Sequence, residues 1–162
     1  MVHPPTRSPP ARRVAEARPG VSWIVRTNLT LDDIGELLEE PLVAVLATLR
    51  PDGSVQLSPV WHEWRDGGFN LWLPADDVKS RHLRRDPRAT IVVAESAAPL
   101  RGVELRTEAR LLPAGDLADA IRIATRYVGP EKGAEYVVGA GYDSVIARLE
   151  PGHLRIWDFA DD

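Results

Sequence analysis

The chain of 162 residues is long enough for one domain with a hydrophobic core, since 44% of its residues are hydrophobic. It contains no cysteine, which excludes a disulfide scaffold and any thiolate metal site. The formal net charge is −4, and residues 1–28 hold five arginines but a single acidic residue, so the remainder is more acidic still. This distribution argues against a nucleic-acid-binding core.

Residues 1–20 are rich in proline, arginine and alanine. Such a segment buries little apolar surface, so we expect a flexible tail, and the folded domain is predicted over residues 21–162. No run approaches the ~20 apolar residues of a membrane span, and no apolar segment of an export signal follows Arg12 and Arg13. We therefore expect a cytoplasmic protein that binds neither nucleic acid nor membranes.

The first part of the domain is predicted to contain a helix and a hairpin. Thr30 has the character of a helix cap, with two aspartates in the first turn, and Pro41 ends the helix. Residues 42–49 form a continuous apolar run, which is typical of a strand buried on both faces. The turn sequence at 51–54 then leads into a second strand over 55–65, so these residues are predicted to form a hairpin.

The rest of the chain continues this pattern of short strands and a few helices. In order, we predict a turn at 66–68, a strand over 69–73, a helix over 76–87, strands over 90–94 and 103–112, helices over 116–128 and 131–138, and strands over 144–149 and 153–159. About seven strands, mostly in hairpins, with two to four helices indicate a mainly β, α+β fold. Closure into an antiparallel barrel is the economical solution.

The helix that begins near Asp76 and ends at Pro87 is the most informative segment. Lys79 and Ser80 lie in its first turn. Free N–H groups at the helix start, the positive end of its dipole, an ammonium and a hydroxyl can all converge on one phosphate. The alternative is a solvated basic helix that only links two strands.

The sequence contains no motif typical of a metal site or of nucleotide binding. None of the four histidines has a metal-like spacing to another ligand, and no P-loop or dinucleotide fingerprint is present. We therefore predict no metal site and name no catalytic residue. Tryptophan is frequent, and Trp61 and Trp64 should point to opposite faces of their strand. One of the two is then left for a planar ligand, or for core or dimer packing.

Four segments, in this order, resemble the split-barrel flavin and deazaflavin oxidoreductases related to pyridoxamine 5′-phosphate oxidase. They are VLATLRPDGS at 45–54, QLSPVW at 56–61, KSRHLRRDP at 79–87 and LRIWDF at 154–159. Together they cover nearly the whole folded part. The resemblance implies a split antiparallel β-barrel of the FMN-binding type, a homodimer, and a cofactor groove between the two protomers.

The resemblance also implies which residues form the site. Lys79 and Ser80 would bind the cofactor phosphate with Arg81 or Arg84 nearby, Ser58, Pro59, Val60 and Trp61 would line the isoalloxazine or deazaflavin ring, and Trp157 would approach from the second subunit. The C-terminal substrate-binding segment of the phosphate-oxidase enzymes is not seen. The chain is more similar to the actinobacterial branch, in which many members use the deazaflavin coenzyme F420 instead of FMN.

The activity implied by this resemblance is an oxidoreductase that passes hydride from coenzyme F420 or FMN to a small organic acceptor. The sequence does not decide between the two cofactors. A non-catalytic carrier of a flavin or tetrapyrrole, with the same fold, remains the alternative.

Overall fold

The computed structural model describes residues 28–98, 100–115 and 117–159. The predicted tail over 1–20 and the first residues of the predicted domain, 21–27, lie outside the described residues. The elements are η1 (Leu31–Leu38), β1 (Ala44–Leu49), β2 (Val55–Val60), β3 (His62–Arg65), β4 (Gly68–Pro74), α1 (Val78–Arg85), β5 (Arg88–Ala94), β6 (Gly102–Pro113), α2 (Ala118–Val128), α3 (Gly133–Ala140), β7 (Ser144–Leu149) and β8 (His153–Trp157).

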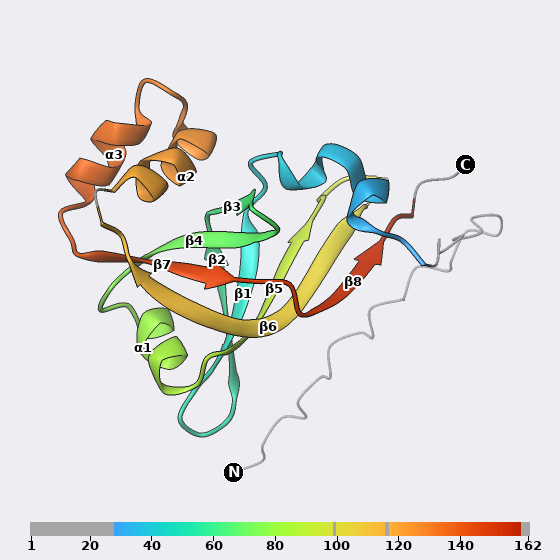
Figure 1. Cartoon of the computed structure of the whole chain (residues 1–162), viewed down its shortest axis with the longest axis horizontal. Coiled ribbons are helices and arrows are strands. Elements are labelled where there is room, and N and C mark those ends of the chain that lie inside the picture. Colours follow the sequence, from blue (N-terminus) through green and yellow to red (C-terminus); the bar gives the residue numbers. More distant parts are fainter. Residues whose placement is uncertain (1–27, 99, 116, 160–162) are drawn as a thin grey trace, which may run out of the picture.

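The strands form one curled antiparallel sheet in the order β2-β1-β5-β6-β7-β4-β3, with β8 paired to β6 (Figure 1). The two strands at the ends of this order, β2 and β3, are consecutive in the chain and separated only by Trp61. The sheet therefore curls until both of its ends lie on one segment. This arrangement confirms the predicted α+β fold with a split antiparallel barrel.

The predicted strand over 55–65 is two strands. Its first half pairs with β1 and its second half with β4, so the chain leaves one side of the barrel for the other at Trp61. The hairpin turns are as predicted. At the β1–β2 turn the Asp52 carboxylate accepts from the Ser54 N–H at 2.9 Å. At the β3–β4 turn, Asp66 and Gly67 have φ values of 48° and 71°, as a two-residue hairpin loop requires.

Two clusters of buried side chains hold the fold together. The larger fills the barrel and includes Leu46, Phe69, Leu71, Ile91, Leu105 and Leu149. The smaller lies between the α2–α3 pair and the sheet and includes Trp72, Ala120, Ile123, Ala124, Val137 and Ile146. Figure 1 shows α2 and α3 side by side at one end of the molecule. The second cluster thus fixes the helical pair beside β4 and β7.

One face of β1 is exposed to solvent in the single chain. The prediction that this strand is buried on both faces is therefore wrong for the single chain. Ala44 and Leu46 are buried, but Val43 and Val45 are 52% and 40% exposed. Across the hairpin Val55 and Leu57 are exposed as well. We call these four residues the apolar stripe. Alternate side chains of a strand project to opposite faces, and no described part of the same chain covers the outer one.

The helices differ from the predictions at their starts. The first is a 3₁₀ helix interrupted at Gly35, where φ is 52°. Its cap is as predicted, because the Thr30 N–H donates to the Asp33 carboxylate at 2.7 Å. The helix expected over 116–128 begins at Ala118 in the described residues, and residue 116 lies outside them. Within the described ranges, no helix combines the length and the apolar character that crossing a membrane requires.

Candidate functional site

A cavity of about 490 Å³ lies where the ends of β2 and β4 meet the start of α1. It is lined by Val43, Pro59, Val60, Trp61, Trp72, Leu73, Pro74, Asp77, Lys79, Tyr136 and Tyr142. The walls are mostly apolar and aromatic, and a cation stands at the α1 side. Four of the residues predicted for a cofactor site, Pro59, Val60, Trp61 and Lys79, are therefore brought together.

The start of α1 pairs Lys79 with a carboxylate. Asp77 caps the helix by accepting from the Lys79 backbone N–H at 3.3 Å, and the Lys79 ammonium donates to the same carboxylate. Partial burial alone would raise the pKa of Asp77, but the hydrogen bonds from the Lys79 side chain and backbone outweigh it and lower the pKa. A phosphate that enters here has to compete with Asp77 for the ammonium.

The other residues predicted for the phosphate end do not line the cavity. The Ser80 side chain is fully buried, and its hydroxyl donates to the Pro74 carbonyl at 2.7 Å. This bond ties α1 to the end of β4. Arg81 and Arg84 are exposed, and the Arg84 guanidinium donates to the Ala75 carbonyl at 2.7 Å. Each guanidinium has five N–H groups, so both arginines keep donors for a ligand on the outer side of α1.

Of the residues predicted to line the cofactor ring, Pro59, Val60 and Trp61 line the cavity and Ser58 does not. Ser58 is buried, and its hydroxyl oxygen lies 3.4 Å from the Gln56 amide nitrogen. Trp61 packs with the α2–α3 cluster, whereas Trp64 packs against the barrel core, which confirms their opposite orientation. The Trp61 ring is stacked on Tyr127, with ring centroids 4.8 Å apart and planes at 4°. Tyr127 therefore covers one face of Trp61 and fixes the orientation of its ring.

Trp157 lies outside this cavity in the single chain. Its ring covers Gly102, where a Cβ atom would come within 2.2 Å of the indole. The register places Val45, Val92, Glu104 and Arg155 in one row across β1, β5, β6 and β8. Trp157 follows two residues after Arg155 and so faces the same side of the sheet as Val45. Three strand spacings of about 4.8 Å separate β8 from β1, roughly 14 Å.

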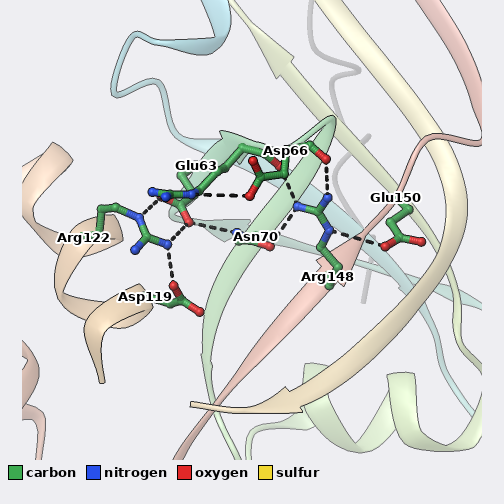
Figure 2. A network of polar contacts seen from close by, with 8 residues as sticks. Glu63, Asp66, Asn70, Asp119, Arg122, Arg148 and Glu150 are labelled. Carbon is green, nitrogen blue, oxygen red and sulfur yellow. Dashed lines mark hydrogen bonds and ion pairs between the residues drawn. The ribbon is translucent and has the colours of Figure 1, made fainter. Parts of the chain in front are cut away.

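A network of ion pairs holds α2 in place, and it was not foreseen from the sequence. Glu63 is 3% exposed. Its two oxygens each accept from the Arg122 guanidinium at 2.7 Å, and Asn70 donates to it at 2.9 Å (Figure 2). Arg148 extends the network to the Asn70 amide oxygen at 3.2 Å. In the sequence, the only sign of this network is the spacing of Asp119 and Arg122, which lie three residues apart on α2. Glu63 is too distant in the sequence for its pairing with Arg122 to be expected.

The network also determines the pKa of its central carboxylate. Burial acts to raise the pKa of Glu63, but the hydrogen bonds from Arg122 and Asn70 outweigh it and lower the pKa. The carboxylate therefore stays ionised and paired. Its effect is to hold α2, and with it the Tyr127 ring, against the β3–β4 hairpin.

His62 is the one fully buried histidine among the described residues. Neither of its ring nitrogens has a hydrogen-bond partner within the described ranges. Burial, followed by the charge of Arg126, lowers its pKa to about 4. Its backbone N–H donates to the Tyr127 hydroxyl at 3.0 Å, and that hydroxyl donates to the Leu42 carbonyl at 2.9 Å. His62 is thus a neutral, fully buried residue that does not line the cavity.

Comparisons with known proteins agree with this architecture. The sequence family described as pyridoxamine 5′-phosphate oxidase matches residues 30–156. A conserved hypothetical protein from Mycobacterium tuberculosis is 26% identical, with a TM-score of 0.70, over 81% of this chain and 86% of that one. A structure named F420 reductase is 27% identical, with a TM-score of 0.61, over 74% and 94% of the two chains.

Some similar structures have other functions. A heme binding protein from Mycobacterium smegmatis is 26% identical, with a TM-score of 0.58, over 74% of this chain and half of that one. No curated protein matches the sequence significantly. The family match covers most of the chain, and the fold and its neighbours agree with it. The chain belongs to the pyridoxamine 5′-phosphate oxidase-like family of split-barrel proteins.

Proposed function

We propose that the protein binds coenzyme F420 or FMN in the cavity beside α1 and reduces a small organic acceptor. The observation that carries this proposal is the cavity itself, because it joins Pro59, Val60 and Trp61 to Lys79 from separate segments of the chain. The similarity to a structure named F420 reductase supports the deazaflavin. A bound, reduced cofactor of this type supplies a hydride, and the acceptor takes up that hydride and one proton from solvent.

The residues present fit such a group. The Trp61 and Trp72 side chains, with Tyr136 packed against both, and the apolar end of β2 offer an aromatic, poorly hydrated wall for the ring. Lys79 offers the cation for a phosphate, at the first turn of a helix. In this proposal Lys79 orients the phosphate, Trp61 fixes the plane of the ring, and Trp72 excludes water from behind it.

We further propose that the site is completed by a second copy of the chain. Val43 both lines the cavity and is 52% exposed, so the cavity opens onto the apolar stripe. Exposed valine and leucine side chains on two adjacent strands favour burial in a symmetric contact. Trp157 lies on the same face of the sheet, outside its own cavity, and is the residue through which the second copy would close the groove.

The two cofactors differ at the end that carries the phosphate. Coenzyme F420 adds an anionic tail beyond it, whereas FMN ends there. Arg81 and Arg84 lie on the exposed side of α1, beyond Lys79, and retain free N–H donors for such a tail. This favours F420 over FMN.

Titration of the purified protein with each cofactor, followed by absorbance and fluorescence, tests the proposal. We expect saturable binding of F420, and oxidation of reduced F420 when quinones or enones are added. Binding without oxidation by any acceptor would favour a carrier, and binding of neither cofactor would overturn the proposal. Heme is the third titration. None of the described histidines lines the cavity, so we expect no heme complex with a histidine ligand.

A further inference from the structure

The Tyr136 ring covers the side of Trp61 on which a planar ligand would lie in the cavity beside α1. Tyr127 already covers one face of the Trp61 indole, with ring centroids 4.8 Å apart and planes at 4°. The Tyr136 centroid lies 5.0 Å from that of Trp61, with the planes at 40°. Carbon atoms in contact are about 3.5–4.0 Å apart, so two rings cannot share one indole face at these distances. Tyr136 therefore packs on the side of Trp61 that Tyr127 leaves open.

Tyr136 is held in this position by ring packing alone. Besides Trp61 it contacts Trp72, with ring centroids 6.2 Å apart and planes at 73°. Within the described ranges the Tyr136 hydroxyl forms no hydrogen bond, and the buried Trp72 indole N–H has no partner either. The Tyr136 side is also open to water, because this residue is 48% exposed. Moving the ring away therefore breaks aromatic contacts but no hydrogen bond.

A groove of about 620 Å³ on the side of α3 offers space for the displaced ring. Tyr136 lines both this groove and the cavity beside α1. A Cβ atom added to Gly139 would meet nothing within 4 Å, so the groove is open at this position. Helical side chains lean toward the N-terminus, and a side chain at 139 would therefore lie over the turn that carries Tyr136. Glycine at 139 leaves that space free.

We propose that Tyr136 is a gate, whose ring packs on Trp61 and Trp72 in the free protein and swings into the α3 groove when a planar ring enters the cavity. The inference rests on the proposed function for the ligand, an isoalloxazine or deazaflavin ring. In the open position Trp61 offers the ligand the face that Tyr136 has left, while Tyr127 still supports the other face. The change is a rotation of one side chain, for which a helix allows two χ1 orientations. The ligand has to displace Tyr136, and this competition lowers its affinity.

Tyr136→Ala tests the sign of this effect. A residue that only lines a site contributes contacts, so its removal weakens binding, whereas removal of a competing gate strengthens binding. We expect Tyr136→Ala to bind the planar ring at least about fivefold more tightly than the wild type, because the aromatic contacts no longer have to be broken. Alanine favours a helix, so α3 should be retained. Tyr136→Phe keeps the ring and should bind as the wild type does.

Gly139→Leu tests the space that receives the ring. Gly139 has no positive φ, and leucine favours a helix more than glycine does, so α3 should again be retained. This variant should hold the gate closed and weaken binding at least about fivefold, but it should have no effect when combined with Tyr136→Ala. Ala134→Leu is the matched control, because it adds the same side chain at an exposed position of α3 that does not line the groove.

The probe is lumiflavin, an isoalloxazine ring without a phosphate, and its binding to the cofactor-free protein is measured by equilibrium dialysis. A thermal melt checks that each variant is folded. Equal or weaker binding of lumiflavin to Tyr136→Ala than to the wild type, or binding to neither, would overturn the gate. So would a loss of affinity on Gly139→Leu that is equally large in the Tyr136→Ala background.

The dialysis does not depend on F420 or FMN. Failure of both cofactors to bind would overturn the proposed function, while the comparison of lumiflavin affinities still decides the gate by itself.

Discussion

Lys79 is proposed to anchor the cofactor phosphate, and it is paired with Asp77. Two substitutions with opposite expected effects on cofactor affinity therefore test this phosphate anchor. Lys79→Ala removes the ammonium. Asp77→Asn removes the competing carboxylate but keeps a side-chain oxygen at the helix cap, a position where asparagine is as favourable as aspartate. If a phosphate binds here, the first change weakens binding and the second strengthens it.

The structure sets the size of each effect. A charge-assisted contact contributes about 1.5–3 kcal/mol, so Lys79→Ala should weaken F420 binding on the order of 10- to 150-fold. The Lys79 and Asp77 side chains are 16% and 22% exposed, so their charges remain partly screened by water. Repulsion between Asp77 and a phosphate about 4 Å away lies between about 1 kcal/mol in bulk water and about 4 kcal/mol near a protein surface, so Asp77→Asn should tighten binding at least about fivefold.

Fluorescence titration with F420 measures both affinities, and a thermal melt checks that each variant is folded. Lys132→Ala is the matched control, because it removes the other lysine of the chain without touching the cavity beside α1. Affinities of Lys79→Ala and Asp77→Asn that both stay within twofold of the wild type would refute the phosphate anchor. A change of the same sign in both would refute the competition between Asp77 and phosphate.

Three further predictions concern the dimer and the stability of the fold. Leu57→Asp, at a position 67% exposed on the apolar stripe, should convert a dimeric wild type to a monomer by light scattering and weaken F420 binding; an unchanged dimeric mass would contradict the apolar stripe as the dimer contact, and a monomeric wild type would contradict the dimer. Arg122→Ala leaves the buried Glu63 carboxylate without its main partner and should lower the free energy of unfolding by about 1–3 kcal/mol in urea titrations, with Arg110→Ala, an exposed arginine, nearly neutral. His62 has a pKa of about 4 in the fold against an ordinary value of 6.5, so the unfolded chain binds the extra proton first. Stability should therefore fall as the pH drops from 6.5 to 4, by up to about 3 kcal/mol, and His62→Leu should lack this part of the slope.

Local features were predictable because neighbouring residues determine them. The two hairpin turns follow from Asp52 to Ser54 and from Asp66-Gly67, whose backbone conformations only a few residue types adopt readily. The start of α1 follows from Asp77, which caps the helix through its own neighbours. The proximity of Lys79 to the segment before Trp61 came from the resemblance to a family and not from the pattern of either segment.

Long-range contacts were not predictable from the residues, and they shape much of the candidate site. The ion pair of Glu63 with Arg122 joins residues far apart in the chain, and neither residue is distinctive where it stands in the sequence. The hydroxyl of Ser80 could have faced a ligand or the protein, and only the position of the Pro74 carbonyl decides that it donates inward. Trp61 likewise needed Tyr127 to fix its ring.

The order of strands and helices, the turns and the helix cap could be predicted from the residues, because these features depend on residue periodicity and on contacts within a few positions. Only the folded chain shows that the strand over 55–65 breaks at Trp61, that the outer face of β1 stays open, and that Tyr136 and Tyr142 line the cavity beside α1. The physical reason is that an apolar pattern tells which side chains leave water but not which partner covers them. That choice is made only when the sheet curls and brings its two ends together.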